Sequence, residues 1–310
     1  MSLKKEFKTL DQQVDILRSK GLIVEDEEKV KQILFRENYF FINGYRYIFY
    51  KSQEERSFIE GTTFEELYAF FLFDRNIRNI MFKNILIVEN NIKSVMSYIM
   101  SKKYGIKEKD YLRHTNFNRD SLKTKRVNDV LGKMKRQIKI NSKQHSATLH
   151  YITNYGYIPM WILVKVLSFG IISELYSILK DEDKEEIANY YRINSYILDI
   201  FLSVTANYRN LCAHEDILYD HKTQRDIPDT IYHKKLNIPK VDDRYVYGKN
   251  DFFAIIIIMK HLLTEEEFRL LLYEIGYEID VLDGKVSTIP LSKILHRIGF
   301  VDNWRSLLEE

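Results

Sequence analysis

The apolar residues of this chain recur mainly at steps of three and four, the period of one face of an α-helix. The longest such run extends from Phe64 to about Lys103 without a glycine or proline, and Gly105 follows it. Thr63 and Glu66 precede it with the spacing of a capping box, in which both side chains satisfy free backbone amides. This pattern predicts one long helix, or two nearly continuous ones.

Shorter helices are predicted before this run. Thr9 and Gln12 have capping-box spacing, and Gly21 is suited to end the helix that follows. Acidic residues at 25–28 favour the start of a second helix, because carboxylates offset the positive end of the helix dipole. That helix is expected to reach Tyr39, where the aromatic segment 39–50 begins and is expected to bend against the core.

The same period continues after the middle of the chain. Pro159 opens an apolar helical run that 168–170 interrupts, and a helix with an acidic start is predicted over 181–191. Ser195 is predicted to cap the next helix, whose apolar stripe extends to Leu211.

A less regular segment, 220–250, contains two prolines and a glycine and is predicted to be a long connection. Helices are expected near 250–263, after the capping box that begins at Thr264, and over 291–298. The most apolar stretch, 252–259, is far shorter than the ~20 residues that a membrane span needs, so we expect it to be buried in the protein.

Composition supports a helical protein. The 310 residues include only 11 Gly and 4 Pro, which argues against a loop-rich β-sandwich and against a disordered chain. Aromatic residues make up 14%; they serve either as core or as platforms for nucleic-acid bases, and their helical spacing favours core. Cys212 is the one cysteine, which excludes an internal disulfide and a cysteine-rich metal site and favours a reducing cytoplasm. The first residues lack the apolar run of a secretory signal.

Charge is unevenly distributed. The net charge is only +3, but residues 102–143 hold 14 Lys and Arg against 4 Asp and Glu, so the remainder is net acidic. The segment is either a solvated helix face or a track for phosphates, with a slight preference for the track. The candidate phosphate contacts in it are Lys123, Lys125, Arg126, Lys133, Lys135 and Arg136.

The richest chemistry lies in the six residues from Arg209 to His214. Arginine holds phosphate through a planar fork of donors, and imidazole exchanges protons near neutral pH. Asn210 and His214 share a helix face, whereas Arg209 and His214 lie roughly 140° apart around the axis. The motif is therefore expected at a helix end or beside an interface. Taken alone it is weak, because an arginine and a histidine fall this close by chance in many proteins.

A second polar cluster lies on the long predicted helix. Asp74, Arg75 and Arg78 form either an intrahelical ion-pair set or an added phosphate grip, and the ion-pair interpretation is favoured. The other histidines show no metal-ligand spacing, so no metal and no cofactor are predicted.

A further signal comes from several short segments taken in order along the chain: 7–17, 21–23, 38–40, 43–47, 64–67, 73–78, 158–170 and 208–214. With these segments the chain resembles, over roughly residues 7–222, the Abi-like abortive-infection proteins of bacteria (the AbiD and AbiF group), whose helical domain belongs to the HEPN superfamily. Beyond about residue 223 the chain carries no such resemblance.

The resemblance implies an all-α HEPN-like bundle in which two copies of an Arg-x4–6-His motif face each other and form one metal-independent ribonuclease site. Arg209 and His214 fit that motif, with the polar Asn210 after the arginine. No second Arg–His pair of this spacing occurs in the chain, so a composite site requires a homodimer or a degenerate second half. In this mechanism His214 acts as general acid or base, Arg209 binds the scissile phosphate and Asn210 orients it. Cys212 is expected to pack rather than react.

The resulting prediction has three parts: an N-terminal helical extension (1–60), a HEPN-like domain (61–222) that includes the basic segment 102–143, and a linker with a small C-terminal helical unit (223–310). The predicted function is a toxin-like phage-defence ribonuclease with RNA as substrate and no membrane association. The alternative is a non-catalytic protein that binds a structured noncoding RNA. A purely protein-binding bundle is the third possibility.

Overall fold

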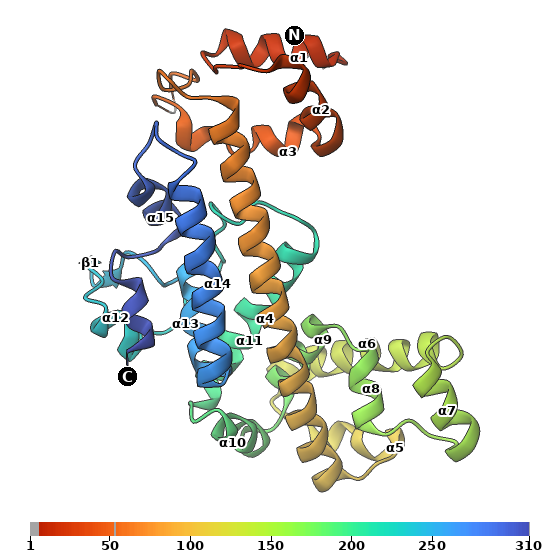
Figure 1. Ribbon diagram of the computed structural model, residues 1–310. Helices are drawn as coiled ribbons and strands as arrows, with labels where there is room; N and C mark the ends of the chain where they lie inside the picture. Colours follow the sequence, from red (N-terminus) through yellow and green to blue (C-terminus); the bar gives the residue numbers. More distant parts are fainter. Residues whose placement is uncertain (1–5, 53, 310) are drawn as a thin grey trace.

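The computed structural model describes residues 6–52 and 54–309, and in them the fold is helical apart from one two-stranded hairpin. The predicted all-α class is confirmed. A single long helix, α4 (Phe64–Tyr104), runs along most of the molecule, and the other elements are arranged around it (Figure 1).

The helix α4 is uninterrupted over 41 residues, about 60 Å at 1.5 Å per residue. Its capping box is present: the Thr63 hydroxyl accepts the Glu66 N–H, and the Glu66 carboxylate accepts the Thr63 N–H. It ends at Gly105, whose φ of +89° lies in the left-handed region that glycine tolerates. Of the two predicted alternatives, one long helix or two nearly continuous ones, the structure has the first.

The N-terminal helices pack at one end of α4 (Figure 1). The predicted capping box of Thr9 and Gln12 is present. The second helix stops earlier than predicted, because Asn38 has a φ of 69° and separates it from a short third helix. The elements are α1 (Leu10–Ser19), α2 (Glu27–Glu37), α3 (Tyr39–Asn43) and the 3-10 helix η1 (Arg46–Phe49).

A lobe at the other end of α4 contains the basic segment (Figure 1). Its last helix, which begins directly after Pro159, packs on α4. The lobe consists of α5 (Glu108–Tyr111), η2 (His114–Asn116), η3 (Ser121–Lys123), α6 (Thr124–Asn141), α7 (Ser146–Tyr155) and α8 (Met160–Val166).

Three helices continue the bundle: α9 (Phe169–Ile178), α10 (Asp181–Tyr190) and α11 (Ser195–Ala213). The helix α11 packs on α4 and on α9, and α10 packs at the C-terminal end of α4, where Asp183 pairs with Lys103 at 2.5 Å. The cap of α11 differs from the prediction. The Asn194 side chain, not that of Ser195, accepts the N–H of Tyr196 at 2.8 Å, and Ser195 is the first helical residue.

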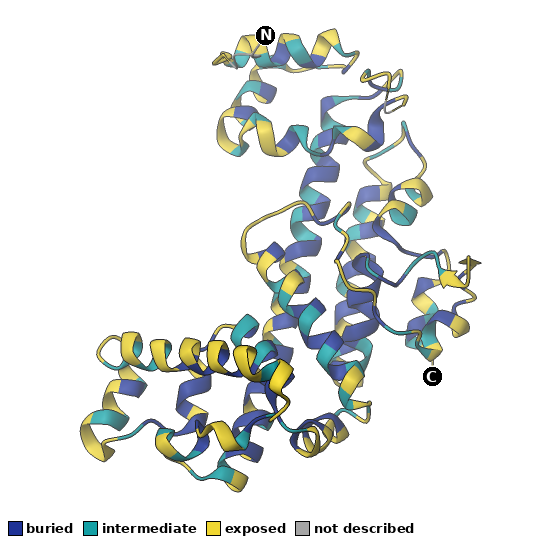
Figure 2. Cartoon of the chain, turned by 180° about the vertical axis from the view of Figure 1, so that it is seen from behind, coloured by how far each residue is buried: buried dark blue, intermediate teal, exposed yellow. Residues whose placement is uncertain are grey.

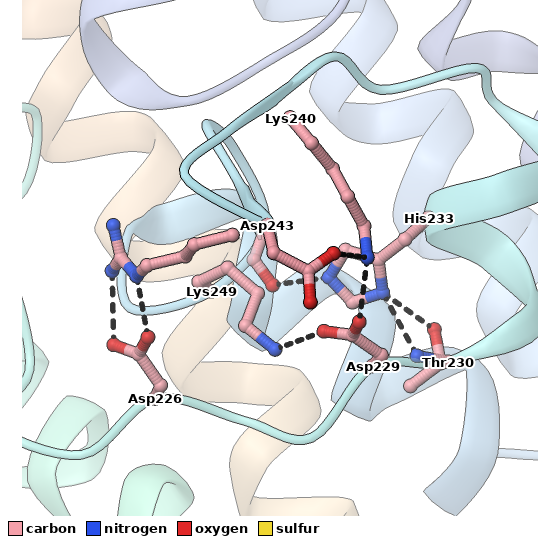
Figure 3. Close-up of polar contacts among 9 residues, drawn as sticks. Asp226, Asp229, Thr230, His233, Lys240, Asp243 and Lys249 are labelled. Atoms are coloured by element: carbon pink, nitrogen blue, oxygen red, sulfur yellow. Dashed lines mark hydrogen bonds and ion pairs between the residues drawn. The ribbon is translucent and has the colours of Figure 1, made fainter.

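The predicted long connection contains α12 (Ile231–Lys235) and the hairpin of β1 (Lys240–Val241) and β2 (Arg244–Tyr245). Polar contacts hold it in place (Figure 3). The buried His233 ring accepts the Thr230 N–H at 3.0 Å and donates to the carbonyl of Gly248 at 2.8 Å. Lys249 pairs with Asp229 at 2.6 Å.

The remaining elements are α13 (Phe252–Leu262), α14 (Glu265–Asp283), α15 (Leu291–Ile298) and η4 (Trp304–Leu308). The apolar stretch 252–259 is a fully buried helix segment, as expected, and α14 packs along α4 (Figures 1 and 2). Among the described residues, no helix combines the length and apolarity that crossing a bilayer requires.

Candidate functional site

The six-residue motif lies at the C-terminal end of α11, as the helix geometry predicted. His214 is the C-cap residue, and its N–H donates to the carbonyl of Asn210 at 3.0 Å. Glu215 follows with a φ of 57°, so the chain turns sharply at this point. The side chains of Asn210 and His214 are exposed one helical turn apart. Because residues four apart lie on one helix face, this places an amide and an imidazole on the same side of the helix end.

Arg209 points elsewhere. Its side chain is 29% exposed, its Nε lies 3.6 Å from Oε2 of Glu89 on α4, and its guanidinium lies over the Phe82 ring. Neither Arg209 Nε nor Glu89 Oε2 makes a hydrogen bond within the described residues. The Arg209 guanidinium is therefore held along α4 by a loose ion pair, and the five-residue spacing places it roughly 140° around the helix axis from His214.

Glu89 was not predicted from the sequence. It lies on the buried face of α4, and its other carboxylate oxygen accepts a hydrogen bond from Lys93 at 2.6 Å. The signal in the sequence was a charged residue within the apolar stripe of Ile85, Val88 and Ile92. Such a residue needs a partner, and the structure supplies two.

The segment after the motif is fixed by Asp74. This fully buried carboxylate accepts the N–H of Tyr219 at 2.8 Å and that of Leu218 at 3.2 Å. The Tyr45 hydroxyl donates to it at 2.6 Å, and Arg78 forms an ion pair with it. Burial beside this carboxylate raises the pKa of the Tyr45 hydroxyl, so the phenol stays protonated. This arrangement, the Asp74 cluster, holds the chain that leaves His214.

A close backbone approach supports the same turn. A Cβ atom at Gly44 would lie 2.6 Å from Cδ1 of Ile217 and 3.2 Å from the carbonyl oxygen of Phe41, so the segment after His214 packs closely against the end of α3.

The two candidate arginines on α4 differ in their surroundings. Arg78 is 3% exposed and is engaged by Asp74 and Tyr45, which favours the structural interpretation for it. Arg75 pairs with Glu37 of α2 at 2.5 Å but remains 29% exposed. The hydrogen bond with Glu37 raises the pKa of Arg75, and the charge of Glu215 adds to the effect. Arg75 therefore lies near the motif, whereas Arg78 has no surface to offer a phosphate.

The basic candidates lie in the lobe, away from the motif. Lys123 ends η3 and is half-buried, and Lys133 pairs with Glu174 at 2.6 Å. The others lie along the exposed outer face of α6 (Figure 2) and form no ion pair among the described residues: Lys125, Arg126, Lys135 and Arg136. The structure thus does not bring these residues to the Arg209–His214 segment.

Two further groups near the motif have shifted pKa values. Burial raises the pKa of the Cys212 thiol to about 12, so it packs as a neutral group, consistent with the sequence interpretation. His221 lies 2.6 Å from Asn207 of α11, and burial lowers the pKa of its ring. In the part of the chain that the structure describes, no three His, Cys, Asp or Glu side chains are grouped as a metal site would require.

Comparison with known proteins gives one match. The model of the Abi-like protein family matches residues 32–220, which is more than half of the chain. No curated protein matches, and no solved structure matches. The matched range includes α4, the basic lobe and all of α11 with its terminal motif. The chain therefore belongs to the Abi-like protein family.

Proposed function

We propose that this protein is a metal-independent RNA endonuclease of the HEPN type that acts in the cytoplasm as a toxin-like abortive-infection factor. The observation that supports it best is the exposed pair of Asn210 and His214 at the end of α11, with a partly exposed arginine on the same turn. Family membership raises the weight of this motif, which would be weak alone.

The chemistry needs a proton-transfer group and a phosphate grip. His214 takes the proton from the RNA 2′-hydroxyl or gives one to the leaving 5′-oxygen, and Arg209 stabilises the charge on the phosphate. The products are a 2′,3′-cyclic phosphate and a 5′-hydroxyl. Because Arg209 and His214 diverge within one chain, the proposal places Arg209 of one copy opposite His214 of a second.

Exposed apolar side chains near the motif support pairing of two copies. Phe40 and Phe41 of α3 are exposed, and Ile217, which contacts the same end of α3, is also exposed. A homodimer that buries this surface would bring two motifs together. Light scattering is expected to give twice the 37.2 kDa chain mass; a strict monomer would contradict the composite site.

The direct test compares RNA cleavage by wild type and His214→Ala. We expect the rate to fall about 10²–10⁴-fold, the usual contribution of a general acid or base, with an unchanged unfolding midpoint. His150→Ala, an exposed histidine of the lobe, is the matched control and should cleave normally. Chelation of divalent metals should leave the rate unchanged. Equal cleavage by His214→Ala and wild type would refute the proposal.

A second candidate function, RNA binding without cleavage, is favoured by the four exposed cations of α6 that form no ion pair with any residue that the structure describes. Each phosphate that a cation neutralises releases counterions, so RNA affinity should fall steeply with salt. The triple variant Lys125→Gln/Lys135→Gln/Arg136→Gln should reduce the slope of log affinity against log salt. The expected reduction is roughly 0.7 for each single-strand phosphate that the variant no longer neutralises. If the RNA affinity of the wild type did not change with salt, the α6 cations would not be a phosphate-binding surface.

A further inference from the structure

A cavity of about 710 Å³ opens where three distant parts of the chain meet: η1 with the residues after it, the segment after α11, and α15. Its size is within the roughly 300–1,000 Å³ typical of small-molecule sites. It is separate from the exposed side chains of Asn210 and His214, neither of which lines it. The lining used below consists of Tyr47, Tyr50, Arg56, Asp220, Lys293 and Arg297.

The cavity has a surplus of positive charge. Its one lining carboxylate, Asp220, pairs with Arg297 at 2.6 Å. Arg56 and Lys293 form no ion pair among the described residues. Beside them, the pKa of Lys20 is lowered by burial and further by the charges of Arg46 and Arg56. Lys20 and Arg46 do not line the cavity, but Arg56, Lys293 and Arg297 do, against the single carboxylate of Asp220, so an anion bound there would offset the surplus charge.

The cavity also has an aromatic wall. Tyr47 is 55% exposed as a residue; the Arg46 guanidinium lies over its ring at 4.1 Å from the centroid, and the ring meets that of Tyr50 edge-on at 5.9 Å. Tyr50 is only 5% exposed, and its hydroxyl makes no hydrogen bond within the described residues. That hydroxyl is shielded from solvent, so Tyr50 supports the Tyr47 ring from below rather than offering a polar contact to a ligand.

We propose that this cavity binds a nucleoside phosphate. The base lies against the Tyr47 ring, and the phosphate is held by Arg56 and Lys293. A planar aromatic group fits the exposed part of the Tyr47 ring, and an anion fits Arg56 and Lys293, which have no ion-pair partner in 6–52 and 54–309. The volume far exceeds that of phosphate alone. A free nucleotide and the terminal nucleotide of an RNA strand share this chemistry.

Calorimetric titration of the full chain tests the proposal. The probes are the four nucleoside monophosphates, the corresponding nucleosides, inorganic phosphate and a short RNA with a 5′-phosphate. Nucleoside monophosphates should bind at least about tenfold more tightly than phosphate or nucleoside alone. Arg56→Gln/Lys293→Gln should weaken binding about tenfold or more, while Lys285→Gln, an exposed lysine outside the cavity, should have no effect.

The aromatic contact has its own variants. Tyr47→Ala should remove the advantage of nucleotides over inorganic phosphate, and Tyr47→Phe should retain it. If only the RNA binds, and the double variant abolishes that binding, the occupant is a strand end. Equal affinity for phosphate and nucleotides, or no change in the double variant, would overturn the proposal. His214→Ala should bind nucleotides normally, so this result is independent of RNA cleavage.

Discussion

Arg78 and Arg209 both contact α4 carboxylates, but in opposite ways. Arg78 is buried with Asp74, Tyr45 donates to the same carboxylate, and two backbone amides complete its hydrogen bonds. Arg209 is 29% exposed and lies 3.6 Å from Glu89 without a hydrogen bond between the paired atoms. Arg78 is therefore a structural residue, whereas Arg209 is held only by a long ion pair.

The difference in burial and hydrogen bonding indicates which of the two arginines is available to bind a phosphate. The Arg78 guanidinium is 3% exposed, with Nη1 engaged by Asp74 and Tyr45, so it has no surface from which to reach a phosphate. A guanidinium in a long, partly exposed ion pair exchanges partners at small cost. Arg209 is in such a long, partly exposed ion pair. The Asp74 cluster contributes to the site separately, because it holds the segment that follows His214.

The largest expected effect comes from breaking the Asp74 cluster. Asp74→Ala should lower the free energy of unfolding by about 3–5 kcal/mol, because Arg78 is left as an unpaired buried charge. Urea unfolding followed by circular dichroism measures the change. The double variant Asp74→Leu/Arg78→Met should recover part of it, since no buried charge remains. A decrease under about 1 kcal/mol in the single variant would show that the cluster does not stabilise the fold.

The reactivity of the buried Cys212 thiol measures whether the C-terminal end of α11 stays packed against the rest of the protein. Its pKa of about 12, caused by burial, keeps the thiolate fraction at pH 8 about 10³-fold below that of a free cysteine. Reaction with a coloured disulfide reagent should be slower than in the urea-unfolded protein by a comparable factor. Raising the pH toward 12 should accelerate it, because the thiolate is the reacting form. Rapid reaction in the native state at pH 8 would mean that the region opens.

Much of this architecture could be predicted from sequence. The capping boxes at Thr9, Thr63 and Thr264 mark real helix starts, because the spacing that satisfies free amides is local. The angle between Arg209 and His214 around the helix axis predicted a motif at a helix end or beside an interface, and the motif lies at the end of α11. The ion-pair interpretation of Arg78, favoured from its spacing to Asp74, agrees with its burial.

The parts that could not be predicted depend on contacts between distant segments. The break at Asn38 has no glycine or proline to signal it, since an asparagine adopts the positive φ. Glu89 faces Arg209 across 120 residues, and Asp74 reaches Leu218 and Tyr219 across a longer interval still. The lining of the cavity comes from three such segments, so no local pattern marks it.

Glu89→Gln tests the Arg209 ion pair directly, and we expect a smaller loss of stability than for Asp74→Ala. The amide keeps the shape but removes the charge that faces Lys93 and Arg209, so we expect the unfolding free energy to fall by about 1–2 kcal/mol. RNA affinity should rise, because Arg209 no longer has a competing carboxylate. Glu174→Gln, which breaks only the surface pair with Lys133, is the control and should cost under about 1 kcal/mol. A fall in RNA affinity would mean that Glu89 orients Arg209 rather than competing for it.

The smallest expected effect on stability is that of Arg209→Gln. Its long, partly exposed ion pair predicts a change under about 1 kcal/mol, against several kcal/mol for Arg78→Gln, which leaves Asp74 buried and unpaired. Urea unfolding of the two variants side by side measures the difference, and Arg209→Lys separates the effect of charge from that of the planar fork. The rate of RNA cleavage should fall in both Arg209 variants, because glutamine has no charge and lysine cannot make the two parallel hydrogen bonds that a guanidinium makes to phosphate. If Arg209→Gln destabilised the protein as much as Arg78→Gln, both arginines would be structural, and the motif would lack its phosphate-binding group.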